Sequence, residues 1–205
     1  YIKMLTEKYH VGGIMGRPME TKEFCEFVKR AQTSSKIPVF ISANIEAGGD
    51  GLVYEGTNVG CNLQIAATNN LEYVKKQADI AAREAIAVGA NLAFAPVVDI
   101  DKNFRNPIMN TRTYGNNANF VKEAGTVFVK KIQQEGIAAS PKHFPGDGVD
   151  ERDQHLLSSV NDLSCEEWDE TYGEIYKSVI EAGTKSIMVG HIMQPAYTKK
   201  INPEI

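Results

Sequence analysis

The sequence predicts an α/β fold of the (β/α)8 or TIM-barrel type, with about five β/α units in this chain. Short apolar runs alternate with longer stretches of helical spacing, a pattern typical of parallel strands covered by helices. A doubly wound sheet also fits, but the chain lacks GxGxxG and GxxxxGKS/T, the motifs of its nucleotide-binding forms. The barrel is favoured because polar residues follow the apolar runs, where barrels carry their active sites. These residues are Asn44, Glu46, Asp99, Lys142, His143 and His191.

Residue types in the sequence predict where each expected strand and helix begins and ends. The strands, rich in Val, Ile and Ala, are expected over residues 11–15, 37–43, 90–99, 136–144 and 186–192. The helices are expected over residues 19–33, 70–89, 117–136 and 163–183. Side chains that suit N-caps stand near the helix starts, at Thr21, Asn70, Asn117 and Ser164. Glycines stand where the last three helices end, at Gly89, Gly136 and Gly183.

The length of the chain sets its domain organisation. Its 205 residues suit one domain with a real core. A closed barrel needs eight strands and typically about 250 residues, and no helix follows the last expected strand before "INPEI" at 201–205. We therefore expect residues 1–205 to form part of a single barrel domain that is incomplete at both ends, with exposed strand edges that disfavour a stable monomer.

Composition excludes several classes of function. Hydrophobic residues at 42% and charged residues at 23% are typical of an ordinary globular protein. A formal net charge of -4 gives no reason to expect nucleic acid or an anionic membrane as partner, and no apolar run approaches the roughly 20 residues of a membrane span. Three distant cysteines without a CxxC pair predict neither a disulfide framework nor a zinc site. The cellular compartment and the oligomeric state stay open.

The segment "KHFPGDGVDERDQHLL", residues 142–157, concentrates the ionisable side chains. Pro145, Gly146 and Gly148 break regular structure, so Asp153 and His155 lie beyond a turn, where extended residues two apart project to the same side. A carboxylate beside an imidazole can orient the ring and raise its basicity, which makes a proton-transfer pair. A solvated acidic loop is the plainer interpretation, and a metal site is a third, although no further ligand stands at a fixed spacing.

The spacing of this segment resembles the signature of family 3 glycoside hydrolases of the β-N-acetylglucosaminidase, or NagZ-like, type. That signature runs K-H-F-P-G-H-G, four residues, then D-S-H. Residues 142–146 and Gly148 match it, and Asp153 and His155 fall at the same offsets from the lysine. The resemblance implies that Asp153 and His155 form an acid/base dyad on a mobile loop of a barrel domain.

Other segments strengthen the resemblance. "ANLAFAPVVDIDKNFRNPIMNTRTYG", from residue 90, is similar to the family's N-x-x-F-A-P-V-x-D and the arginine motif that follows it, so Arg112 is expected to contact the sugar. "VFISANIEAGG" resembles the family's strand ending in D-Q-E-G-G, and "SIMVGHIMQPAYT" resembles a later strand with a histidine near its end, here His191. The resemblance assigns Lys142, His143, Arg112 and Asn44 to substrate binding.

Three positions depart from the family pattern. Asn44 stands in place of an aspartate that holds sugar hydroxyls, and its amide can still donate and accept such bonds. Asp147 replaces the second histidine of the motif, and Gln154 replaces the small serine between the dyad residues. The family's nucleophile is an aspartate on a strand beyond His191, and the sequence after that residue contains no such segment.

The resemblance implies a retaining glycoside hydrolase that removes β-linked N-acetylglucosamine from cell-wall-derived or related glycosides. It implies no cofactor and no metal, and a small carbohydrate as the partner. Phosphorolysis by the same dyad, a β-glucosidase of the same family, and a catalytically inactive sugar-binding barrel remain alternatives. A cytoplasmic protein and an exported lipoprotein are equally compatible with the sequence.

Overall fold

The computed structural model describes residues 1–198 and contains a parallel sheet of four strands in the order β1-β2-β3-β4. The strands are β1 (Gly13–Met15), β2 (Phe40–Ala43), β3 (Leu92–Ala93) and β4 (Ala138–Ala139). Ile14 pairs with Ile41, Ser42 with Leu92, and Ala93 with Ala139. This sequential parallel order confirms the predicted barrel-type α/β fold. The segment "INPEI", residues 201–205, before which no helix was expected after the last strand, lies outside the described residues.

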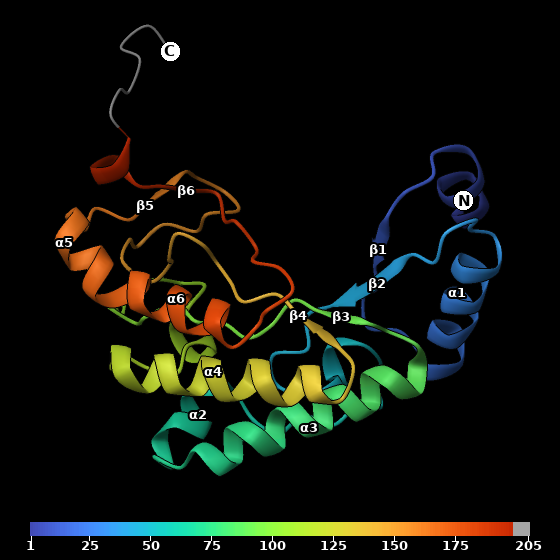
Figure 1. The fold of residues 1–205 in the computed structure, drawn as a ribbon, viewed down its shortest axis with the longest axis horizontal. Helices are drawn as coiled ribbons and strands as arrows, with labels where there is room; N and C mark the ends of the chain where they lie inside the picture. The colour runs from blue at the N-terminus through green and yellow to red at the C-terminus, as the bar shows by residue number, and fades with distance from the viewer. Residues whose placement is uncertain (199–205) are drawn as a thin grey trace, which may run out of the picture.

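Helices cover the outer side of this sheet (Figure 1). α3 packs against α4, and α4 packs against α6. The α-helices are α1 (Thr21–Thr33), α2 (Asn62–Ala67), α3 (Leu71–Val88), α4 (Ala118–Gln134), α5 (Cys165–Trp168) and α6 (Glu174–Glu181). The π- and 3-10 turns are η1 (Met4–Lys8), η2 (Gly49–Gly51), η3 (Asn110–Arg112), η4 (Asp169–Gly173) and η5 (Pro195–Tyr197).

The helix ends follow the local signals, with one correction. The side chains of Asn70, Asn117 and Ser164 accept hydrogen bonds from backbone N–H groups in the first turns of α3, α4 and α5, as predicted. The prediction of Thr21 as an N-cap was wrong, because Glu20 holds that position and Thr21 is already helical. The Thr21 hydroxyl instead donates to Glu55, far along the chain, a contact that local sequence does not reveal.

The fifth expected strand, residues 186–192, is only partly regular. Its backbone runs parallel to the chain after β4 and pairs through hydrogen bonds from Phe144 N to Met188 O and from Gly190 N to Phe144 O, and through the bridge between Phe144 and Val189. The regular strand β6 (Ile192–Met193) begins where the expected one ends, and it pairs with β5 (Ser159–Val160) in a second sheet that the sequence did not predict.

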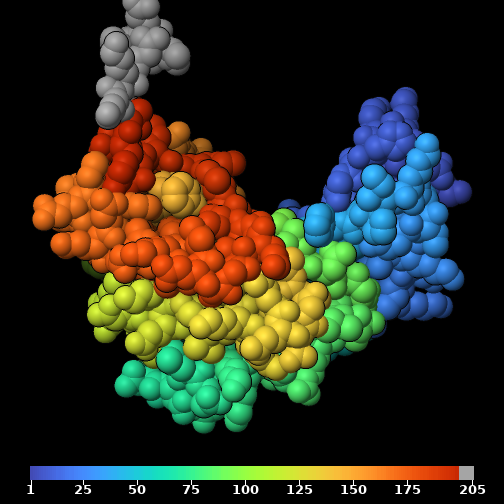
Figure 2. Space-filling model, viewed as in Figure 1, coloured from blue at the N-terminus to red at the C-terminus, as the bar shows by residue number. Residues whose placement is uncertain are grey.

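The molecule forms an open arch. One end consists of β1 and α1, and the other consists of β5, β6 and α6 (Figure 1). The space-filling view shows that the molecule is hollowed between these two ends (Figure 2). The core lies between sheet and helices, where Val98, in the segment after β3, and Phe128 of α4 are fully buried. The arch therefore leaves the carboxyl ends of the strands accessible.

Candidate active site

A cavity of about 630 Å³ lies at the carboxyl ends of the strands. Each parallel segment contributes a residue at or just beyond its end: Met15, Asn44, Phe94, Lys142 with His143, and Gly190 with His191. Glu46, Arg112, Gln154 and His155 also line it, and Arg17 and Asp50 complete its polar wall. The cavity is where the barrel prediction placed the active site.

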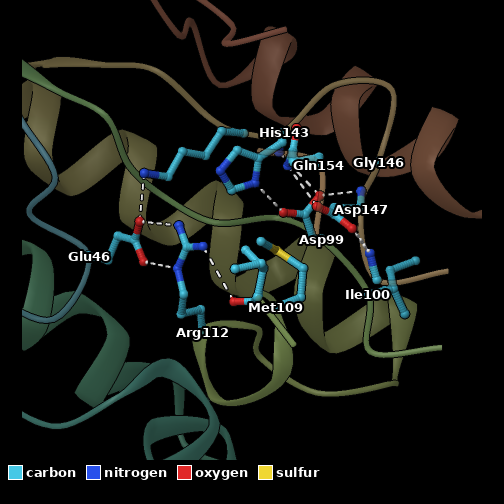
Figure 3. A network of polar contacts seen from close by, with 12 residues as sticks. Glu46, Asp99, Ile100, Met109, Arg112, His143, Gly146, Asp147 and Gln154 are labelled. Atoms are coloured by element: carbon cyan, nitrogen blue, oxygen red, sulfur yellow. Dashed lines mark hydrogen bonds and ion pairs between the residues drawn. The ribbon is translucent and has the colours of Figure 1, made fainter. Parts of the chain in front are cut away.

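Glu46 is the centre of an ion cluster on this cavity. Arg112 Nε donates to one Glu46 oxygen at 2.9 Å and Arg112 Nη2 donates to the other at 2.7 Å. Lys142 Nζ lies 2.6 Å from Glu46 Oε1 and donates to Asn44 Oδ1 at 2.9 Å. Figure 3 shows Glu46 facing the guanidinium of Arg112. The cluster fixes two cationic side chains on the cavity wall, where they can donate hydrogen bonds to a bound molecule.

Burial and charge act against each other in this cluster. Burial of Glu46 favours its neutral form, but the hydrogen bonds of Arg112 and the charges of Lys142 and Arg112 outweigh burial and lower the pKa of Glu46 from 4.5 to about 2. Burial also lowers the pKa of Lys142, an effect that Glu46 opposes. For Arg112, the hydrogen bonds and charge of Glu46 outweigh burial and raise the pKa. Glu46 is therefore ionised at neutral pH.

His143 is held by a buried aspartate. Asp99, fully buried after β3, accepts from the backbone N of His143 at 3.1 Å and lies 2.6 Å from His143 Nδ1. The same carboxylate accepts from Asp147 N at 2.7 Å. Asp99 thus orients the His143 ring and fixes the turn that follows it, and Figure 3 shows this arrangement.

The structure brings Asp153 and His155 together. His155 Nδ1 lies 2.7 Å from Asp153 Oδ1, and the same oxygen accepts from the backbone N of His155 at 2.9 Å. These contacts lower the pKa of Asp153, the backbone hydrogen bond most strongly. The expected extended geometry was wrong: the chain bends from Asp153 to Leu157, whose N–H donates to Asp153 O, because the carboxylate binds its own downstream backbone. Among residues 1–198, no protein group hydrogen-bonds to His155 Nε2.

The predicted site residues fall into two groups around the cavity. Asn44, Arg112 and Lys142 share one cluster, while His155 lines another part of the wall with its side chain 61% exposed. Sequence reasoning left Glu46 and Asp99 without an active-site role. The spacing of Asn44 and Glu46 was the available signal, because residues two apart in extended chain point to the same side.

Residues 1–198 contain neither a candidate metal cluster nor a candidate membrane-spanning helix. Within residues 1–198, no group of three or more His, Cys, Asp and Glu side chains is arranged to hold a metal ion. No helix in the same part of the chain has the length and apolar character needed to cross a membrane.

Comparison with known proteins identifies the family. Residues 2–203 match the "Glycosyl hydrolase family 3 N terminal domain". A "Beta-N-acetylglucosaminidase/beta-glucosidase" from Cellulomonas fimi is 51% identical over the whole chain, which spans 36% of that relative. The solved structure of "Beta-glucoside phosphorylase BglX" is 43% identical, with a TM-score of 0.90 over 95% of this chain and 36% of the other.

A more distant solved structure, a family 3 β-N-acetylglucosaminidase from a Paenibacillus species, is 29% identical, with a TM-score of 0.89 over 95% of this chain and 39% of the other. The chain therefore spans little more than a third of the length of these three proteins. It belongs to glycoside hydrolase family 3, and its match is to the N-terminal domain of that family.

Proposed function

We propose that the protein containing this chain cleaves the β-glycosidic bond of N-acetylglucosaminides or glucosides with retention of configuration. The observation that supports it best is the Asp153–His155 pair, whose His155 lines the cavity that Glu46, Arg112 and Lys142 also line. The 51% identical relative named for both activities supports the two sugars. Residues 1–205 would form part of one barrel domain.

His155 would act as general acid and then as general base. Its Nδ1 faces Asp153 at 2.7 Å, so Nε2 is the nitrogen available to protonate the leaving oxygen and later to take a proton from water. Asp153 would hold the tautomer and stabilise the imidazolium that forms. As a positioned acid, the pair would contribute about 10² to 10⁴ in rate.

Retention also needs a carboxylate nucleophile about 5 to 5.5 Å from the acid/base group in the usual two-carboxylate enzymes. Two carboxylates on the cavity wall are engaged elsewhere: Glu46 by Arg112 and Lys142, and Asp50 by Asn58, whose Nδ2 donates to it at 2.6 Å. We assign the nucleophile to a part of the protein outside residues 1–198, in agreement with the family pattern.

Asn44, Arg112, Lys142 and His143 would bind the hydroxyls of the sugar. Arg112 and Lys142 keep donors beyond those used by Glu46 and Asn44. Such fixed donors suit an uncharged sugar, since orientation rather than net charge then decides binding. Cell-wall-derived glycosides are the proposed source of the N-acetylglucosaminides.

Phosphorolysis is a second candidate. It is favoured by the 43% identical structure named as a β-glucoside phosphorylase and by Arg17 and His191, which line the same cavity as His155. A neutral histidine also repels an incoming phosphate less than a glutamate would. Phosphate would then replace water in the second step, with release of a sugar 1-phosphate.

One experiment separates these reactions. The full-length protein is incubated with aryl β-N-acetylglucosaminide and aryl β-glucoside, with and without inorganic phosphate, and the products are identified by mass spectrometry. Free sugar at a phosphate-independent rate supports hydrolysis, and sugar 1-phosphate supports phosphorolysis. Sugar binding by calorimetry without turnover of either substrate would overturn both and leave a sugar-binding barrel.

A further inference from the structure

Gln154, between the two dyad residues, is buried, unlike its neighbour His155. Its side chain is buried, with 6% of the residue exposed, whereas the His155 side chain is 61% exposed. A long polar side chain that is buried in a loop needs hydrogen-bond partners for both ends of its amide.

Both ends of the Gln154 amide are satisfied. Gln154 Nε2 donates to Asp147 Oδ2 at 2.7 Å, and Gln154 Oε1 accepts from the backbone N of His191 at 2.8 Å. Because one end faces an acceptor and the other a donor, only one orientation of the amide satisfies both contacts. Gln154 therefore connects the dyad loop to the end of the last parallel segment.

Asp147 is in turn held rigidly. Its Oδ1 accepts from Asn106 Nδ2 at 2.9 Å and from Gly148 N at 2.6 Å, and its own N–H donates to Asp99 at 2.7 Å. The residue is 2% exposed, and Figure 3 shows it between Asp99 and Gln154. The aspartate that orients His143 thus also anchors the partner of Gln154.

Gly190 provides the space for this contact. A Cβ atom at residue 190 would lie 2.8 Å from Gln154 Oε1 and 3.3 Å from the Cβ of His143. Both are closer than side-chain atoms normally approach, so a side chain at residue 190 would displace the Gln154 amide from its present position.

We propose that Asp147 and Gln154 are positioning residues, which together fix the Asp153–His155 dyad over the cavity. The two positions at which the 142–157 segment departs from the family pattern are in direct contact, so each departure accounts for the other. The inference rests on the proposed function, because it concerns how the acid/base group of that function, His155, is oriented. Neither residue touches the sugar in this role.

An exchange of the two side-chain types tests the pair. Asp147→Asn places an amide donor against the Gln154 donor, and Gln154→Glu places a carboxylate against Asp147. In the double variant the bond runs in the reverse direction: the new amide at 147 donates to the new carboxylate at 154, whose second oxygen still accepts from His191 N. The number of charges is then the same as in the natural protein.

We expect each single variant to lower kcat roughly 10- to 100-fold, as displacement of a catalytic group by about 1 Å does. The double variant should return to within about threefold of the natural rate, since its buried hydrogen bonds are complete again. The loss should grow as the leaving group becomes a poorer one, because such substrates depend on His155 for a proton, while KM and sugar affinity by calorimetry stay nearly constant. Asp162→Asn, an exposed carboxylate of the same region, is the charge control.

The rates of these variants decide the proposal. Single variants that keep the natural kcat on poor leaving groups would overturn the proposal, as would a double variant slower than both. If Gln154→Glu does not fold by circular dichroism, Gln154→Ala replaces it, with the same expected loss of kcat at unchanged sugar affinity. If the natural protein turns over neither substrate, the proposed function is contradicted. If the natural protein is active and His155→Ala abolishes its activity, but the variants of Asp147 and Gln154 leave kcat unchanged, only the positioning role is contradicted.

Discussion

Glu46 and Arg112, 66 positions apart in sequence, form a two-point contact in which Nε and Nη2 of the guanidinium each donate to a separate carboxylate oxygen. Two parallel hydrogen bonds fix direction as well as distance. The contact ties the end of β2 to the segment just before α4, and Lys142 joins it from the end of β4. One carboxylate thus sets the positions of the two cations that are proposed to bind sugar.

Removing the charge of Glu46 should destabilise the protein more than removing an exposed charge. Glu46→Gln leaves the nearly buried Lys142 and the partly buried Arg112 without their shared partner, and breaking such a pair costs about 3 to 5 kcal/mol. Urea unfolding of the full-length protein measures the change. Glu26→Gln is the control, because its pair with Arg30 is exposed and such pairs contribute about 1 kcal/mol or less.

The same carboxylate should make stability fall in acid. The pKa of Glu46 is about 2 in the folded state against 4.5 ordinarily, so ionised Glu46 stabilises the fold above about pH 4.5. That contribution, about 3 kcal/mol, is lost as the pH falls from about 4.5 towards 2. Unfolding free energies of the natural protein and Glu46→Gln, measured against pH, should differ by less at pH 2.5 than at pH 6. Parallel curves would contradict this assignment.

His155 and Asp153 should differ in how strongly they affect turnover. His155→Ala removes the proposed proton donor and should lower kcat by about 10² to 10⁴ on substrates with poor leaving groups. Asp153→Asn keeps the imidazole but loses the carboxylate at Nδ1, so a smaller loss is expected. The kcat values of both variants across aryl glycosides of increasing leaving-group pKa measure this. A His155→Ala enzyme with the natural rate on the poorest leaving group would exclude the dyad.

The parts of the fold that local chemistry determines were predictable from the sequence. Asn70, Asn117 and Ser164 cap the helices they precede, and Gly89 ends α3 with a φ of 84°. The 2-stranded sheet of β5 and β6 was not predictable, because two residues in each strand are too few to give a period. The start of α1 was also misplaced, because Glu20, which makes no capping hydrogen bond with its side chain, holds the N-cap position, and the Thr21 hydroxyl donates to the distant Glu55.

The part of the site that was predictable is the part that depends only on the spacing of residues along the sequence. Asp153 and His155 are two residues apart, so their contact was expected, although the turn that joins them was not. The contact of Glu46 with Arg112 depends on how separate segments meet near the strand ends, and that of Asp147 with Gln154 depends on how the 142–157 loop folds back on itself. A single sequence does not determine those meetings, because loop conformations and side-chain directions are fixed only by the packed fold.

Gly125, in the middle of α4, should resist replacement by alanine although alanine is the better helix former. A Cβ at residue 125 would lie 2.7 Å from Val98 Cγ1 and 3.4 Å from Val179 Cγ1. The gain in helix propensity is about 1 kcal/mol, whereas overpacking a filled core costs typically about 1 to 3 kcal/mol. Val98 is fully buried and immediately precedes Asp99, so it cannot move aside without shifting the carboxylate that orients His143.

We therefore expect Gly125→Ala to lower both the midpoint of thermal unfolding and the kcat. The control is Gly12→Ala, whose Cβ would meet nothing within 4 Å and which should leave both values unchanged. A Gly125→Ala protein that is more stable than the natural one would mean that α4 can move away from the sheet at little cost.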